Sequence, residues 1–282
     1  MREHTISKER GVSEAIGYLI ILGLVVTGIG LVTLYGYPIL MQQQGLANMR
    51  NMERTMIVIQ NDIKSLTYTL DNFKETDFQV GGGPIMILPS NAVPQAFDIS
   101  WGGSGTGLPQ QSTGWLSFGE IRYFSTQDNA VVAYENGAVI KKYLGQNAIL
   151  LAGPRWYVAK SSDGTTTLVI NLVNLVSGGK LVSETGAGAI RTRYSSTNIS
   201  TPVFSGSPAT IRNSIRITYR PDTVNVTPNG YAQAWRMYLT DPSALGLVES
   251  PTGSNQYIFP PSIYPSGINN VVVKKYDVIV EM

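Results

Sequence analysis

The sequence has no cysteine and only one histidine, His4, which excludes several kinds of site. Without cysteine the chain has neither a disulfide framework nor a thiolate ligand for a metal. His4 lies within residues 1–11, and if this N-terminal segment is cleaved off as a leader peptide, the remaining chain has no histidine either. Histidine is the commonest general base and metal ligand. Ser-His-Asp and Cys-His catalytic sites then cannot form. We expect no enzymatic activity, no catalytic residues, no cofactor and no metal site.

Charge is also scarce, because Asp, Glu, Lys and Arg make up only 14% of the residues, against a typical value of about 25%. The net charge is +2 and no basic cluster is present, so we expect no nucleic-acid partner. A carboxylate pair for hydrolysis remains possible in principle. No pair among the 19 acidic residues stands out by its sequence context.

One long segment has no charge at all, since residues 15–49 contain no Asp, Glu, Lys or Arg. Within it, Ala15–Gly36 is a run of 22 predominantly apolar residues. A bilayer core of about 30 Å needs about 20 such residues in a helix. The sequence therefore predicts one membrane-spanning helix.

The flanks of this segment predict its orientation. Arg2, Lys8 and Arg10 lie on the short N-terminal side, and basic flanks tend to stay in the cytoplasm. We therefore expect a cytoplasmic N-terminus, a plasma-membrane location and a large C-terminal domain outside the cell.

The junction before the apolar run reads Arg10-Gly11-Val12-Ser13-Glu14-Ala15-Ile16-Gly17. In a secretory signal the cleavage site follows the apolar segment, whereas here the small residue Gly11 precedes it. This arrangement resembles the class III signal peptide of archaeal type IV pilins, in which a basic residue and Gly are often followed by Val-Ser-Pro-x-Ile-Gly. Glu14 stands where many of those sequences have Pro.

The resemblance implies that a prepilin peptidase cleaves between Gly11 and Val12 and leaves the apolar helix on the mature chain. It also implies that this helix assembles with other pilin subunits into a surface filament. Glu14 would then lie two positions from the new amino group and could pair with the Val12 ammonium of a neighbouring subunit. Two alternatives stay open: an uncleaved signal anchor, and a Glu14 that only faces the lipid headgroups.

Small residues could let neighbouring helices approach closely, as at Gly23-x-x-x-Thr27. We expect this hydrophobic assembly helix to cover residues 12–41, with Pro38 as a kink or break.

An amphipathic helical extension is predicted over residues 42–76. Its apolar residues recur at three- and four-residue spacing, at Met49, Met52, Met56, Ile59, Ile63, Leu66, Leu70 and Phe73. This stripe could pack against the following domain or against neighbouring helices, and Gly81-Gly82-Gly83-Pro84 is expected to end the helical region.

Residues 77–282 are expected to form a β-rich extracellular domain, which makes the fold α+β with an antiparallel sheet or sandwich. Short β-like runs predict strands at Leu116–Ser125, Ala130–Tyr134, Ala138–Leu144, Ala148–Leu151, Trp156–Lys160, Thr166–Leu175, Ser214–Arg220, Ala232–Leu239 and Val271–Val280. Asn136-Gly137 and Asp163-Gly164 predict tight hairpin turns.

Loop residues suggest how this domain meets its surroundings. Asn198 and Asn225 begin N-glycosylation sequons, which suit a location outside the cell. Tyr257, Phe259 and Tyr264 form an aromatic cluster that is either an adhesive surface or an attachment of the loop to its own domain.

Together these features predict a structural subunit of an archaeal type IV pilus-like filament, with its β-rich domain exposed for adhesion or interaction. The large size of that domain favours a minor or tip subunit. The alternative is a single-pass anchored ectodomain with glycan-binding or carboxylate-dependent hydrolase activity. The mature N-terminus distinguishes the two.

Overall fold

The computed structural model describes residues 7–69, 71–103, 108–177, 182–200, 214–224, 226, 230–265 and 267–282. The chain divides into two compact units, Met1–Ala47 and Asn48–Met282. The second unit contains all the strands of the described chain and is called the head below. The helices are α1 (Ser7–Leu31), a π-helical turn (Val32–Gly36), α2 (Tyr37–Tyr68) and α4 (Ala232–Thr240).

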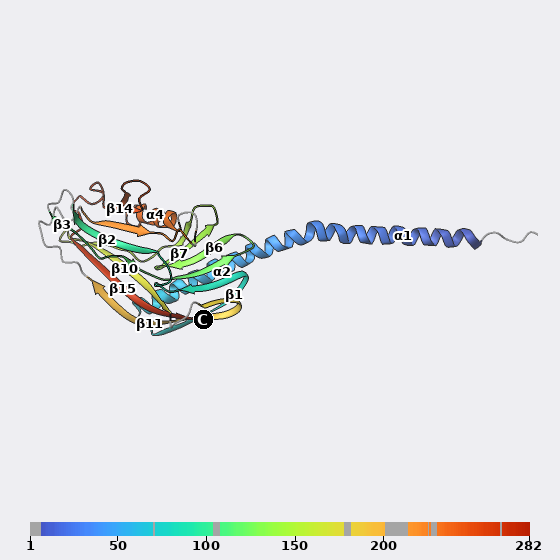
Figure 1. Ribbon diagram of the computed structural model, residues 1–282, viewed down its shortest axis with the longest axis horizontal. Helices are drawn as coiled ribbons and strands as arrows, with labels where there is room; N and C mark the ends of the chain where they lie inside the picture. The colour runs from blue at the N-terminus through green and yellow to red at the C-terminus, as the bar shows by residue number, and fades with distance from the viewer. Residues whose placement is uncertain are drawn as a thin grey trace, which may run out of the picture. The chain divides into compact units, whose positions relative to one another are not determined.

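The head is built on a nine-stranded sheet in the order β8-β7-β6-β5-β1-β11-β15-β10-β9 (Figure 1). Every neighbouring pair is antiparallel except β10 and β15. Its strands are β1 (Phe73–Leu88), β5 (Glu120–Ser125), β6 (Ala130–Glu135), β7 (Ala138–Tyr143), β8 (Ile149–Ala152), β9 (Tyr157–Lys160), β10 (Thr166–Ser177), β11 (Val182–Ser200) and β15 (Asn270–Glu281).

A second, six-stranded sheet covers one face of the first. Five strands follow the order β13-β14-β12-β2-β3, and β4 pairs with β2. They are β2 (Ala96–Gly103), β3 (Leu108–Ser112), β4 (Leu116–Ser117), β12 (Arg216–Arg220), β13 (Val248–Glu249) and β14 (Gln256–Ile258). The expected α+β fold, a helical N-terminus followed by antiparallel sheets, is confirmed.

The large sheet is curled. Its two edge strands, β8 and β9, are joined only by residues 153–156, a connection that spans at most about 17 Å. The turn after β6 also reaches β10, because the side-chain oxygen Oδ1 of Asn136 accepts a hydrogen bond of 2.9 Å from the backbone N–H of Val173. The sheet edges are therefore held near each other.

Alternate residues of the large sheet serve two different cores. In β6, all of whose residues are buried, Val131 and Ala133 face the six-stranded sheet, whereas Val132 and Tyr134 face α2. This explains why β6 is continuously apolar instead of alternating, since a sheet covered on both faces needs apolar residues on both. The head thus has three layers: α2, the large sheet, and the small sheet with α4.

The apolar stripe of α2 fills the second core. Met49, Met52, Met56, Ile59, Ile63 and Leu66 are each at most 2% exposed. They pack on inward-facing residues of the large sheet such as Phe78, Ile85 and Val278. The stripe was predicted to pack against either the domain or other helices, and the structure shows the former.

The boundary between helix and strand differs from the predicted one. The helical extension was expected to continue to residue 76 and the β-rich domain to begin at residue 77, but α2 ends at Tyr68 and β1 begins at Phe73. Phe73 matches the helical spacing by coincidence, and Leu70 lies outside the described residues. From Phe73 to Val80 the residues instead follow a period of two, and Phe78 and Val80 are buried. The compact head begins still earlier, at Asn48.

The glycine run does not end a helix but interrupts β1. The pairing of β1 with β11 shifts register between Val80 and Ile85, which defines a bulge. A Cβ at Gly83 would lie 1.8 Å from the carbonyl oxygen of Phe124, so only glycine fits there.

One predicted strand is wrong. Residues Ala232–Leu239 form α4, and its buried residues Ala232, Trp235 and Leu239 follow a helical spacing. Both predicted hairpins are confirmed. Asn136 and Gly137 both have positive φ, 47° and 81°, as a tight hairpin turn requires, and the loop at Gly164 (φ 82°) joins β9 to β10.

The α2 stripe generates a stability prediction for the head, residues 48–282. Met56→Ala should lower the free energy of unfolding by about 2–5 kcal/mol, because Met56 is fully buried. Val58→Ala is the matched control on the same helix, since Val58 is 48% exposed, and should change it by no more than about 0.5 kcal/mol. Urea denaturation followed by circular dichroism measures both, and equal effects would show that the stripe is not part of the core.

Candidate functional site

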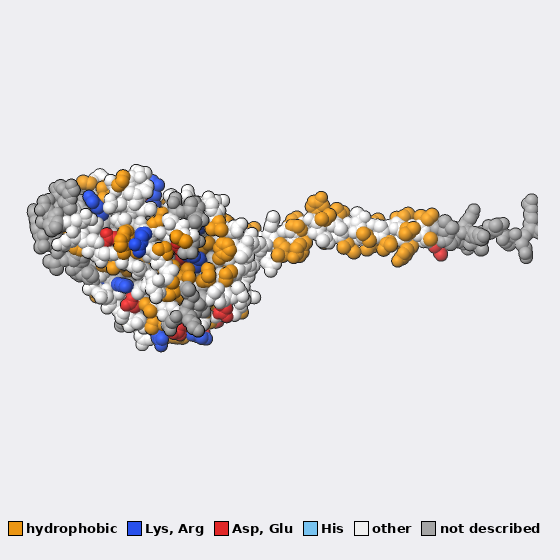
Figure 2. Space-filling view, in the orientation of Figure 1, with side chains coloured by type: hydrophobic (Ala, Val, Ile, Leu, Met, Phe, Trp, Pro, Cys, Tyr) orange, Lys and Arg blue, Asp and Glu red, His pale blue; other side chains and the backbone are white. Residues whose placement is uncertain are grey.

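The first unit presents an apolar helical surface. Figure 2 shows hydrophobic side chains along the visible side of this helix. Over residues 16–46 its large apolar side chains are 37–72% exposed and lie on all sides of the helix. In the described chain, one helix is long and apolar enough to cross a membrane. A helix that is apolar all round needs lipid or other protein around it.

A π-helical turn at Val32–Gly36 accommodates the proline in this helix. The ring of Pro38 would clash with the carbonyl of Leu34 in a regular α-helix. Here the backbone N–H of Tyr37 donates to the carbonyl of Val32, five residues back, so the turn is widened just before the proline. The expected irregularity at Pro38 is thus a wide turn, and helical structure continues through α2.

The predicted assembly residues all lie on α1. Gly11 and Val12 are inside the helix, and Glu14 is exposed. A Cβ on Gly23 would meet nothing within 4 Å, and the hydroxyl of Thr27 donates to the carbonyl of Gly23 at 2.7 Å. Because the Thr27 hydroxyl is bonded within its own helix, it needs no partner from outside. Gly23 and Thr27 together therefore leave a shallow place on the helix surface that another helix can approach closely.

The predicted head sites have different outcomes. Asn198 is exposed on β11, where a glycan could be attached, whereas Asn225 lies outside the described residues. Tyr257, Phe259 and Tyr264 are at most 7% exposed. The hydroxyl of Tyr264 donates to the carbonyl of Leu245 at 2.5 Å. These aromatics attach the loop to the core and do not form an adhesive surface.

A buried carboxylate pair that the sequence did not single out lies between the two sheets. Glu120 on β5 is directly opposite Glu135 on β6, and both are fully buried. Arg122 donates to both carboxylate oxygens of Glu120, at 2.7 and 2.6 Å, and its Nη2 lies 3.3 Å from Asp222. The hydroxyl of Tyr231 donates to Glu120 at 2.6 Å. Both carboxylate oxygens of Glu120 thus have donors in this buried position.

Glu135 has a different environment. Its Oε1 accepts hydrogen bonds from Tyr219 and Trp235, at 2.9 and 2.6 Å, but its buried Oε2 has no hydrogen-bond partner. Burial first, and then the nearby Glu120, raise the pKa of Glu135 to about 8. No substrate can reach the buried pair, so it is not a hydrolytic site. Its ionisation instead affects the stability of the head. Among the described residues, no group of three or more His, Asp or Glu side chains could hold a metal ion.

The chain thus combines an N-terminal helix able to span a membrane with a head of two packed sheets. It belongs to a family of unknown function, DUF7289, whose profile matches residues 10–256. The match begins just before the apolar run and reaches β14. No match to a curated protein or to a solved structure was found.

The two buried carboxylates should respond oppositely to neutralisation. Folding raises the pKa of Glu135 from 4.5 to about 8, so the folded state holds its proton more tightly. The head should therefore lose stability as pH rises from about 4.5 to about 8, by on the order of 4 kcal/mol in total. Glu135→Gln should remove most of this slope and be more stable than the wild type at pH 8. Glu120→Gln should be destabilised by about 3–5 kcal/mol, because it leaves Arg122 without its main partner. Urea denaturation at pH 5, 6.5 and 8 checks both, and a Glu135→Gln variant with the wild-type slope would contradict the assignment.

Proposed function

We propose that this protein is a structural subunit, minor or tip, of a type IV pilus-like surface filament of archaeal type. Its N-terminal helix is held in the membrane before assembly and packs with the helices of other subunits afterwards. A prepilin peptidase removes residues 1–11 first. The head faces the medium, where it is available for adhesion or interaction.

The observation that carries this proposal is the length of exposed apolar helix. Ala15–Met41 is 27 residues, about 40 Å of helix, whereas a bilayer core is about 30 Å thick. Leu34, Ile39 and Leu40 are 53–71% exposed near the C-terminal end of this stretch. A bilayer covers this length only if the helix tilts strongly, but neighbouring helices in a filament would cover all of it.

Two further features support the proposal. The small residue Gly11 precedes the apolar run, so cleavage there keeps the helix on the mature chain. The basic residues Arg2, Lys8 and Arg10 favour a cytoplasmic N-terminus and an external head.

The second candidate is an ectodomain on an uncleaved anchor. Its hydrolase version requires an accessible carboxylate pair, and the pair Glu120–Glu135 is fully buried. Its glycan-binding version differs from the filament proposal mainly in whether the chain is cleaved after Gly11. The state of the N-terminus in cells therefore separates the two candidates.

We predict that cleavage falls between Gly11 and Val12. Gly11→Val should abolish it, because the added side chain crowds the peptidase site. Gly28→Val, which makes the same change in the same helix away from the junction, should be processed normally. Mass spectrometry of the membrane-extracted protein reads out the N-terminus, and an intact residue 1–11 segment in cells with an active prepilin peptidase would show that the chain is an anchor.

We further predict that Glu14 serves assembly. Glu14→Gln keeps the size of the side chain but removes the charge that could pair with a neighbouring Val12 ammonium, since unpaired charge is costly in an apolar core. The variant should be processed and accumulate in the membrane but be lost from sheared filaments. Glu75→Gln, which removes an exposed carboxylate on the head paired with Arg191, is the control. If Glu14→Gln enters filaments at the level of this control, Glu14 is only an interfacial residue.

A further inference from the structure

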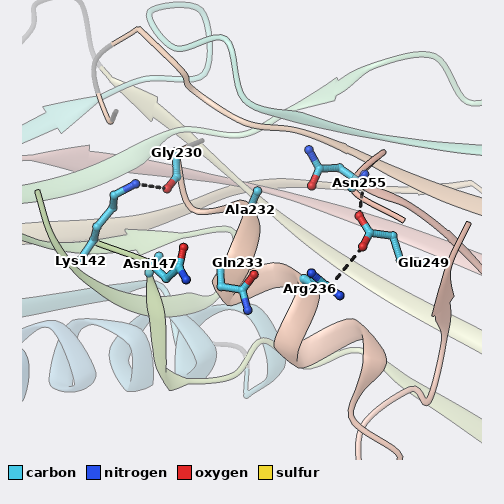
Figure 3. A pocket seen from close by; sticks show the side chains of 10 residues that line it. Lys142, Asn147, Gly230, Ala232, Gln233, Arg236, Glu249 and Asn255 are labelled. Atoms are coloured by element: carbon cyan, nitrogen blue, oxygen red, sulfur yellow. Dashed lines mark hydrogen bonds and ion pairs between the residues drawn. The ribbon is translucent and has the colours of Figure 1, made fainter. Parts of the chain in front are cut away.

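The head contains a polar pocket of about 170 Å³ where three segments distant in sequence meet (Figure 3). The segments are β7 with the loop after it, the start of α4, and the β13–β14 hairpin. The pocket is therefore far larger than the space that one water molecule needs. Its polar side chains are those of Lys142, Asn147, Gln233, Arg236, Glu249 and Asn255.

One wall of the pocket supplies hydrogen-bond donors. Lys142 is 1% exposed, and its ammonium donates to the carbonyl of Gly230 at 2.8 Å. Burial lowers the pKa of Lys142. Ala232 and Gln233 lie in the first turn of α4, where Tyr231 provides no side-chain cap. Backbone N–H groups in the first turn of a helix have no acceptor within the helix, so this wall favours an oxygen of a bound molecule.

The opposite wall supplies a buried acceptor. The side chain of Glu249 is only 5% exposed. Its Oε1 accepts from the backbone N–H of Asn255 at 2.9 Å, but its buried Oε2 has no hydrogen-bond partner. Nε of Arg236 lies 3.3 Å from Oε2 in an ion pair that lacks hydrogen-bond geometry. A buried carboxylate oxygen that has an ion pair but no hydrogen bond can still accept one, and a donor from a ligand would supply it.

The backbone conformation of Asn255 positions the N–H group that donates to Glu249. Its φ is 55°, a left-handed conformation that Asn tolerates better than most residues, and in it the backbone N–H reaches Glu249. Its side chain also lines the pocket, as do the amides of Asn147 and Gln233. Amide side chains both donate and accept.

The mixed charges narrow the chemical class of the ligand. Arg236 is already paired with Glu249, and Lys142 already donates to the carbonyl of Gly230, so the charged groups of the pocket have partners of their own. A hydroxyl group is neutral and can both donate and accept. We propose that this pocket binds one neutral sugar residue, whose hydroxyls donate to Glu249 and accept from the wall formed by Lys142 and the first turn of α4. The site goes beyond filament assembly and does not depend on it, because a head on a simple anchor would carry the same pocket.

The test is saturation-transfer NMR and calorimetric titration on the full chain, solubilised in a detergent without a sugar headgroup. The probes are glucose, galactose, mannose and N-acetylglucosamine. At least one should bind saturably. Gln233→Ala and Glu249→Gln should each weaken that binding by about tenfold or more, since the first removes an amide from the pocket and the second replaces a carboxylate acceptor with an amide donor. Gln233 is only partly buried, so this variant should keep its fold, which thermal denaturation verifies. Glu75→Gln is again the control and should bind like the wild type.

Three results would overturn the proposal. The first is a lack of saturable binding by all four sugars. The second is sugar binding that Gln233→Ala leaves unchanged, which would place the sugar elsewhere. The third is binding of inorganic phosphate or glycine that the same variants abolish, which would make this a site for an anion or a zwitterion. None of these results bears on filament assembly, which is measured in cells.

Discussion

The burial of one face of α2 by the nine-stranded sheet is the interaction on which the rest of the head depends. Six apolar residues of α2 are almost completely buried. At about 1.5–3 kcal/mol each, their burial contributes on the order of 10 kcal/mol, which is comparable with the net stability of a whole domain. The curl of the sheet follows from the same interaction, because its inner face must surround a helix. Gln60 joins two strand ends to this helix through its Nε2, which donates to the carbonyls of Gly137 and Gly153.

This arrangement gives a single helical segment two tasks. α2 begins in the first unit and ends in the head, and its residues change character along the way: Ile39 and Leu40 are exposed, whereas Met49 and Met52 are buried. Head stability and the proposed assembly therefore depend on different parts of the same helix. Substitutions in one part can be tested without changing the other.

The sequence predicted those features that depend on local patterns. The apolar run, the α2 stripe up to Leu66 and the Asn136-Gly137 turn each follow from spacing or from a residue type that one backbone conformation demands. The missed elements depend on partners far away in sequence. β11 is rich in Gly, Ser and Thr, and it is held between β1 and β15 by backbone pairing more than by an apolar pattern. Ala232–Leu239 was predicted as a strand, whereas Ala232, Trp235 and Leu239 pack on the core with a helical period.

The candidate sites also fall into those visible in a local sequence pattern and those formed by residues far apart in the sequence. The residues of the proposed assembly helix lie close together in sequence and could be recognised there. Glu120 and Glu135 become a pair only through strand pairing, and the proposed sugar pocket combines Lys142 with Glu249, more than 100 positions later in the sequence. No local signal marks either site.

The central claim is that α2 belongs to the core of the head. Hydrogen exchange of the full chain in detergent, followed by mass spectrometry, measures this directly. The account predicts that the amides of residues 49–66 exchange as slowly as those of β10 and β15, because they open only when the head unfolds. Exchange of residues 49–66 that is orders of magnitude faster than that of β10 and β15 would contradict it, since the helix would then come away from a sheet that stays folded.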